Sequence, residues 1–240
     1  MVRRCPLAAV AVIVVCCPLY GQMGDWSFSA AARGLLITTS KIYPNPNNPS
    51  FELRTITTPF SSVLGFGGEL TARSFGASYY FFLNVEYLSQ VKSEMKLDGS
   101  VSPPRYLPVE DGYSMIPIEI GGQVYVPLGS SSWRISMGGG VGAYVTTRVY
   151  SVAGISADPV GSRTGFGIHV SVNSEYVLIP GVSVIAGLKF RDPEVDVRNR
   201  FPVSSILYDG RVVRFQQGEI PSRINVDGMT ISAGVRVEIL

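Results

Sequence analysis

Residues 79–92 read YYFFLNVEYLSQVK, and their side chains alternate between two chemical classes. Odd positions from Tyr79 to Val91 are almost all apolar, whereas even positions include Asn84, Glu86 and Lys92. Alternation with a period of two predicts a β-strand with one apolar face. Strands of soluble proteins usually run about 5–6 residues, but a strand that crosses a membrane needs about 9–11. This stretch is long enough to cross a membrane.

Seven other segments repeat the alternation, some of them weakly. Ile224 and Val226 are out of phase with the last segment, which predicts a β-bulge near Gly228. Pro117 is unusual inside a strand because proline has no N–H to donate. The eight predicted strands cover residues 25–39, 62–75, 79–92, 115–126, 133–148, 166–178, 182–191 and 229–239.

The connections alternate between long and short. Long loops are expected at residues 41–61, 93–112, 149–162 and 192–223, and short turns at Gly76, 129–132 and 180–181. Short turns on one rim and long loops on the other are typical of outer-membrane barrels. We therefore predict an all-β fold, an eight-stranded antiparallel up-and-down transmembrane β-barrel with short periplasmic turns and four long extracellular loops. A soluble barrel of the lipocalin type, suggested by Gly24-Asp25-Trp26, is the alternative.

Charges within the predicted strands fall on the face that carries Gly, Ser and Thr. A Lys or Arg that faced lipid at the midplane would cost about 2–4 kcal/mol, so we expect this face to line the lumen. The predicted lumen residues are Glu69, Arg73, Glu86, Glu119, Arg134, His169, Glu175, Lys189, Arg191 and Arg236. The predicted interfacial aromatic girdle, at the short-turn ends of the strands, is Trp26, Tyr79, Tyr125, Trp133 and Tyr176.

The N-terminus has the layout of a secretory signal peptide. Arg3 and Arg4 precede an apolar run at residues 7–15, and Gly21 is the expected cleavage position. We expect residues 1–21 to be the signal and residues 22–240 to form one barrel domain in the outer membrane. All three cysteines fall within this signal, and cleavage as a lipoprotein before Cys16 or Cys17 is the weaker alternative.

Composition excludes several classes of function. The 20 Lys and Arg nearly balance the 18 Asp and Glu, so no basic field for nucleic acid exists. One histidine, His169, and no cysteine beyond Cys17 argue against a zinc site. The acidic strand top, defined as Asp192, Glu194 and Asp196, is expected to be solvated, with cation binding as a minor alternative. The residues indicate no enzyme and no cofactor.

The chain resembles the OmpW-type outer-membrane barrels. The resemblance rests on residues 125–144 (YVPLGSSSWRISMGGGVGAY), on the paired strands within residues 165–195, and on the acidic strand top. Barrels of the OmpX and OmpA type are the close alternative. The resemblance implies outer-membrane lipid and the barrel-assembly machinery as partners, although the chain ends in Leu240 where such barrels usually end in Phe or Tyr.

Two functions follow as hypotheses. The resemblance implies a conduit in which small apolar molecules enter at the loop end and leave sideways through the wall, because a narrow lumen filled with charges leaves no wide aqueous pore. Alternatively, the barrel anchors loops that bind host surface molecules. The loop residues suited to this are Pro44, Pro46 and Pro49 in one loop and Phe201, Tyr208, Arg211, Arg214 and Phe215 in another.

Overall fold

The computed structural model describes residues 26–98, 104–128, 130, 132–161 and 163–239. The predicted signal at residues 1–21 lies outside the described residues. Within the described part, no helix is both long enough and apolar enough to span a membrane.

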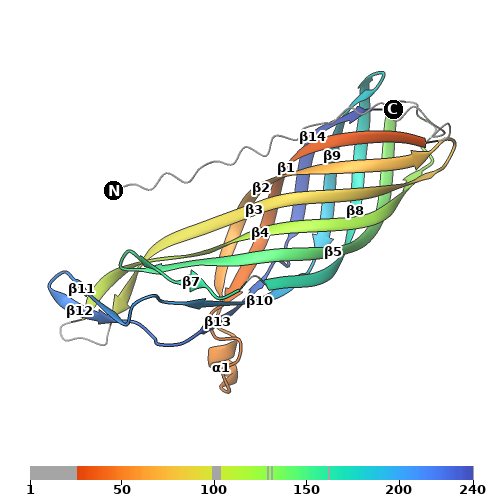
Figure 1. The fold of residues 1–240 in the computed structure, drawn as a ribbon. Coiled ribbons are helices and arrows are strands. Elements are labelled where there is room, and N and C mark those ends of the chain that lie inside the picture. Colours follow the sequence, from red (N-terminus) through yellow and green to blue (C-terminus); the bar gives the residue numbers. More distant parts are fainter. Residues whose placement is uncertain (1–25, 99–103, 129, 131, 162, 240) are drawn as a thin grey trace.

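Eight antiparallel strands close into one ring (Figure 1). Each strand pairs with its neighbour along the chain, and β14 pairs back with β1 from Ser29↔Glu238 to Ile37↔Thr230. Closure leaves no free sheet edge, which a membrane-crossing sheet requires. The ring strands are β1 (Trp26–Tyr43), β2 (Thr58–Ser74), β3 (Tyr79–Asp98), β4 (Arg105–Val126), β5 (Trp133–Val152), β8 (Arg163–Ile179), β9 (Val182–Arg191) and β14 (Met229–Glu238).

The long connections contain far more strand than the sequence suggested. The expected loop at residues 93–112 is instead mostly the paired tips of β3 and β4, from Ser93↔Glu110 to Asp98↔Arg105. The region 192–223 folds into β10 (Glu194–Arg200), β11 (Ser205–Tyr208), β12 (Arg211–Arg214) and β13 (Ile220–Asn225), and β6 (Ile155–Ser156) and β7 (Asp158–Pro159) occupy 149–162. Only the connection with helix α1 (Phe51–Arg54) lacks strand. Continued pairing satisfies backbone groups that an irregular loop would expose.

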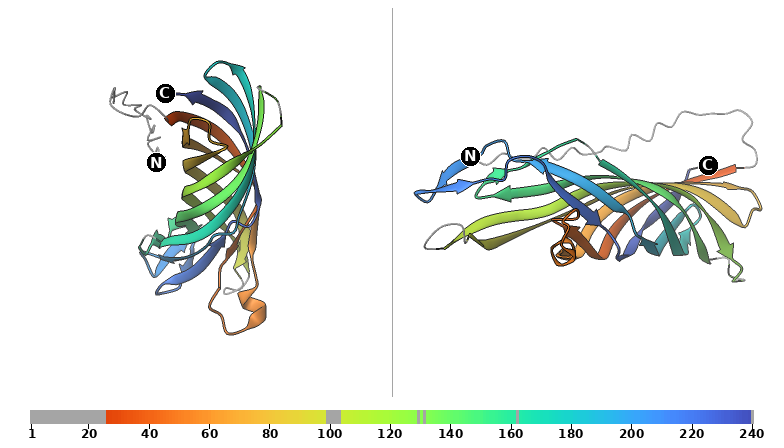
Figure 2. Two further views of the ribbon diagram at one scale, coloured as in Figure 1. Left: turned by 90° about the vertical axis from the view of Figure 1, so that its right-hand side faces the viewer. Right: turned by 90° about the horizontal axis from the view of Figure 1, so that it is seen from below.

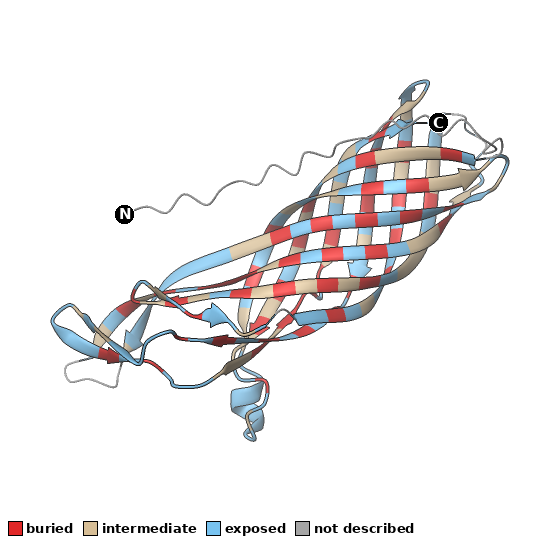
Figure 3. Ribbon diagram, in the orientation of Figure 1, coloured by how far each residue is buried: buried red, intermediate tan, exposed pale blue. Residues whose placement is uncertain are grey.

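Buried and exposed residues alternate along the ring strands (Figure 3), and the exposed ones are apolar. Along β3, Tyr79 to Tyr87 are exposed at odd positions, while Tyr80 to Leu88 are buried at even ones. Phe166 and Ile168 on the exterior are 78% and 74% exposed, whereas Glu119 in the interior is fully buried. An apolar exterior belongs in lipid, and a lipocalin would place its apolar side chains inside. The fold is therefore a transmembrane barrel, and the soluble alternative is wrong.

The predicted bulge near Gly228 is confirmed by the register. Lys41 pairs with Asn225 and Ile37 pairs with Thr230, so four steps along β1 correspond to five along the opposite chain. A β-carbon on Gly228 would lie 2.4 Å from the carbonyl oxygen of Thr39. Glycine permits this close approach of two backbones, which bends the chain from β13 into β14.

Beyond the ring, the tips of β3, β4 and β5 with β11 and β12 form an extended arm (Figure 2). A second apolar cluster lies there, with the rings of Phe201 and Phe215 stacked at 4.4 Å. The Arg105 guanidinium joins the hairpin of β11 and β12 to β4, since it donates to the carbonyl oxygens of Tyr208 and Val212, both at 3.1 Å.

Replacement of Arg105 by alanine is expected to free this hairpin and leave the barrel intact. The variant loses the donors that hold two strands by their backbone, so limited proteolysis of the refolded protein should cut between residues 205 and 214 sooner than in the wild type. Arg214→Ala, an exposed arginine of the same hairpin, is the control. Equal cutting rates in the two variants would contradict the role of Arg105.

Candidate functional site in the barrel interior

The interior is layered along the barrel axis, and the layer nearest the short turns consists of ion pairs. The Arg236 guanidinium contacts two carboxylates, Glu69 at 2.7 Å and Glu175 at 2.5 Å. Glu69 also accepts a hydrogen bond from Arg33 at 2.6 Å. These side chains come from β1, β2, β8 and β14, so the layer ties opposite walls of the ring together. Arg33 was not among the predicted lumen residues because the alternation of β1 is weak.

Farther from the short turns lies a second layer, the four-charge cluster of Glu86, Glu119, Lys189 and Arg191. Lys189 Nζ contacts Glu86 at 2.6 Å and Glu119 at 2.5 Å, and Arg191 contacts the same two carboxylates at 2.6 Å and 3.1 Å. Asn84 donates to both carboxylates, and Tyr144 donates to Glu119. Two negative and two positive charges cancel. This neutral, crosslinked layer fills the lumen with side chains, as the narrow interior of an eight-stranded barrel allows.

His169 lies in the interior beside this cluster, 3% exposed. Its ring is 5.7 Å from the Phe82 ring, and Nδ1 is 4.0 Å from the nearest oxygen of Glu119. The sequence suggested a histidine hydrogen-bonded to its neighbours, but neither ring nitrogen has a partner among the described residues. The expectation of a hydrogen-bonded side chain is wrong, while the placement in the lumen agrees with the alternation.

The third layer is apolar, which the sequence analysis did not predict. Leu88, Tyr113 and Met115 are fully buried, and together they join a cluster drawn from seven strands. The other members are Leu35, Ile37, Ile42, Phe60, Val63, Tyr144, Val195, Val197, Ile224 and Val226. The only sequence signal is a local one: on β3 and β4 the inward positions change from charged to apolar between Glu86 and Leu88 and between Glu119 and Met115.

A buried ion pair closes the apolar layer on the side of the arm. Arg148 and Asp111 form two parallel hydrogen bonds of 2.8 Å, and Arg148 also donates to Ser222. Asn199 donates to the carbonyl oxygens of Arg148 and Ala157, at 3.2 Å and 3.1 Å. The apolar layer is thus bounded by charge at both ends of the lumen.

The remaining predicted lumen residues, Arg73 and Arg134, lie at the short-turn mouth of the barrel, where they line a cavity. Tyr125 also lines this cavity, with its ring 5.1 Å from that of Tyr80. Its assignment to the aromatic girdle is wrong, because Tyr125 shares the inward face of β4 with Glu119 and Gln123. Four girdle residues do lie on the exterior at strand ends, exposed by 40–55%: Trp26, Tyr79, Trp133 and Tyr176.

The acidic strand top lies on the exterior, where Asp192, Glu194 and Asp196 are exposed. Arg223 on β13 contacts Asp196 at 2.8 Å and Glu194 at 3.4 Å. The hydrogen bond with Asp196, followed by the attraction of both carboxylates, raises the pKa of Arg223 above its ordinary value. Because charges that face lipid are costly, we expect these side chains to lie outside the hydrocarbon layer. The described residues contain no group of three side chains able to hold a metal ion.

The ladder between β3 and β4 lacks two pairs beside the boundary between the charged and apolar layers, although its register is unchanged. β3 and β4 pair at Val85↔Ile118 and again at Leu88↔Met115, but the two positions between them form no pair. Those positions are Glu86 with Pro117 and Tyr87 with Ile116. Pro117 has no N–H, so one ladder hydrogen bond cannot form. The proline that was unusual in the sequence therefore weakens one defined place in the barrel wall.

Comparisons with known proteins agree on the fold. The crystal structure of the outer membrane protein OprG from Pseudomonas aeruginosa covers 90% of this chain and 96% of its own, with a TM-score of 0.55 and 14% identity. Neisserial surface protein A and Ail of Yersinia pestis give TM-scores of 0.40 and 0.43, at 14% and 10% identity over 88% and 90% of this chain and 97% and 98% of theirs, too low for any argument. No protein-family model matches. No curated protein matches either.

Proposed function

We propose that this barrel, which has the fold and apolar exterior of a small outer-membrane protein, is a conduit for small apolar molecules that leave sideways into the bilayer. The observation that carries the proposal is the position of the unpaired step at Pro117, directly beside the apolar layer. Leu88 and Met115, the first pair above the step, are both fully buried in that layer.

Two routes out of the apolar layer, one toward the short turns and one sideways through the wall, differ in the interactions that a solute must break. A molecule among the apolar side chains that moved toward the short turns would have to disrupt the four-charge cluster, and leaving one charge of a buried pair without its partner costs about 3–5 kcal/mol. Moving outward between β3 and β4 crosses the step at which Pro117 already removes one ladder hydrogen bond. The outer surface there is apolar, since Tyr87, Ile116 and Ile118 are about 40% exposed to the membrane. The sideways route is the one of lower cost.

A reversible crosslink across the step tests the proposal. Tyr87→Cys and Ile116→Cys place two thiols opposite each other at the unpaired position, in a chain whose own three cysteines are confined to residues 5–17. Oxidation joins β3 to β4 within the distance that a disulfide allows. Uptake of radiolabelled toluene by intact cells that produce the variant should fall to that of cells without the protein, and reduction should restore it.

Leu83→Cys with Ile120→Cys is the matched control, because these positions already pair in the wall. Its oxidation should leave toluene uptake unchanged. Equal uptake by the oxidised and reduced forms of the first variant would refute the sideways route. Glycerol uptake that rose together with toluene uptake would instead indicate an aqueous pore.

Attachment to host molecules through the arm is the second candidate, and one observation favours it. Leu207 and Val212 face each other on the hairpin of β11 and β12 and are 73% and 52% exposed. Exposed aliphatic pairs on a defined hairpin are suited to a protein partner. Cells whose barrel carries Leu207→Asp should lose adhesion to host cells but keep toluene uptake, which separates the two functions.

A further inference from the structure

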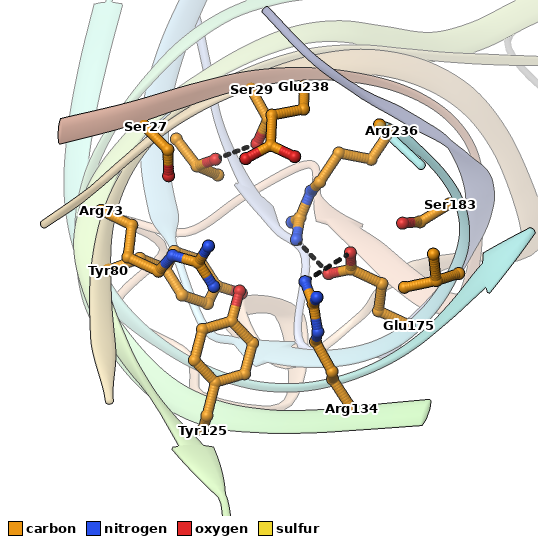
Figure 4. Close-up of a pocket in the computed structure, with 13 residues that line it drawn as sticks. Ser27, Ser29, Arg73, Tyr80, Tyr125, Arg134, Glu175, Ser183, Arg236 and Glu238 are labelled. Carbon is orange, nitrogen blue, oxygen red and sulfur yellow. Dashed lines mark hydrogen bonds and ion pairs between the residues drawn. The ribbon is translucent and has the colours of Figure 1, made fainter. Parts of the chain in front are cut away.

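A polar cavity of about 60 Å³ lies at the short-turn mouth of the barrel, on the opposite side of both charged layers from the apolar layer. Its walls come from all eight ring strands, and Figure 4 shows that Arg73 and Arg134 reach into it with Tyr125 between them. The volume admits roughly four to six waters, because each needs about 10–15 Å³ measured in this way. A small polar molecule of similar size fits the same space.

The cavity carries a surplus of positive charge. Three arginines line it, and two of them share the carboxylate of Glu175: Arg236 at 2.5 Å and Arg134 at the longer distance of 3.7 Å. Arg236 also contacts Glu69, on the side of the cavity away from the short turns. Glu238, exposed at the rim, is the second lining carboxylate. Among the described residues it forms no ion pair with any of the three arginines.

Arg73 has no carboxylate partner within the described part of the chain. Its guanidinium instead lies over the ring of Tyr125, 5.8 Å from the ring centre. Stacking on an aromatic face orients a guanidinium and leaves its N–H groups free to donate at its edge. Arg134 is in a similar state, because its one ion pair with a described residue is long, at 3.7 Å, and its side chain is 39% exposed. Two guanidinium groups therefore face the cavity, and neither makes a hydrogen bond to a carboxylate of the described residues.

We propose that the mouth cavity binds a small oxyanion, a carboxylate or a phosphate, between Arg73 and Arg134. Guanidinium groups recognise both anions through paired N–H···O bonds, which are stronger than bonds between neutral groups. Hydroxyl groups of Ser27, Ser183 and Tyr125 line the same cavity and supply further donors. Because the site opens at the short-turn rim, its ligand comes from the periplasmic side. The site is independent of the proposed conduit.

The site is tested by titrating the refolded, full-length barrel with inorganic phosphate. Binding is measured by phosphorus NMR line broadening and by calorimetry. We expect saturable binding of one phosphate with a dissociation constant of about 1 mM. Arg73→Gln and Arg134→Gln should each weaken it about tenfold, the loss expected for one charged hydrogen-bonding group. Tyr125→Phe keeps the ring beneath Arg73, so it should have a smaller effect.

Arg163→Gln is the matched control, since Arg163 is an exposed arginine at the other end of β8. It removes the same charge and should leave binding unchanged. Acetate that displaces phosphate competitively would identify the ligand class as oxyanions in general, whereas phosphate that resists acetate would restrict it to phosphate. Absence of saturable binding in a barrel shown to be folded by its heat-dependent gel mobility would overturn the proposal, as would equal weakening by Arg163→Gln.

Discussion

Replacement of Arg191 by methionine is expected to destabilise the folded barrel by about 3–5 kcal/mol, the cost of removing one partner from a buried ionic group. The change leaves Glu86 and Glu119 facing each other with only Lys189 between them, and neither carboxylate is exposed to water. Guanidinium titration of the protein in lipid vesicles, followed by the fluorescence of its two tryptophans, measures the loss.

Two variants make this result specific. Arg198→Met removes an arginine from the exposed pair with Glu219, which are 49% and 33% exposed, and should cost less than about 1 kcal/mol. Glu86→Gln combined with Arg191→Met leaves one carboxylate with one ammonium, so it should recover part of the loss. An Arg191→Met barrel that unfolded at the wild-type denaturant concentration would show that the four-charge cluster does not hold the walls together.

Replacement of Gly140 by alanine is expected to prevent β4 and β5 from pairing in their present register. A β-carbon at this position would lie 2.0 Å from the carbonyl oxygen of Ile120 and 2.7 Å from the Cα of Gly121. Both contacts are with backbone, which cannot rotate away as a side chain would. Overpacking usually costs about 1–3 kcal/mol, and we expect this variant at or beyond the upper limit, with little heat-modifiable barrel after refolding.

Gly122→Ala is the control on the facing strand. Its added carbon would meet nothing closer than 3.7 Å, an ordinary contact, so refolding yield and denaturation midpoint should match the wild type. Equal behaviour of Gly140→Ala and Gly122→Ala would mean that β4 and β5 separate more easily than the register implies. The glycine run at residues 138–142 thus marks close approach of two backbones, as well as small inward side chains.

Strand number and the division of side chains between two faces followed from alternation, and the cost of charges in lipid indicated which face lines the lumen. On β3 the alternation of Tyr79–Lys92 separated Tyr87 from Glu86 correctly, because the side chains of a strand have a strict period of two. The same rule placed Tyr125 in the lumen with Gln123, and the girdle assignment failed where proximity to a strand end was preferred to that rule. The bulge at Gly228 was also predictable, since a phase change within one apolar face requires an extra residue.

Strand length beyond the membrane was not predictable in the same way. The tips of β3 and β4 carry mixed residues such as Glu94 and Lys96 on one face and Met95 and Leu97 on the other, and their pairing depends on the partner strand. Arg33 was missed because Ala31, Ala32 and Gly34 around it give no contrast between faces.

By itself, the sequence of this protein determined a closed eight-stranded barrel with an apolar exterior and charges inside, because lipid imposes one periodicity on every strand. Only the tertiary structure decided which charges meet, that an apolar layer separates them from Arg148 and Asp111, and that Pro117 opens the ladder beside that layer. These features depend on how far each strand slides past its neighbour. That register is set by contacts across the ring, so no single strand contains it.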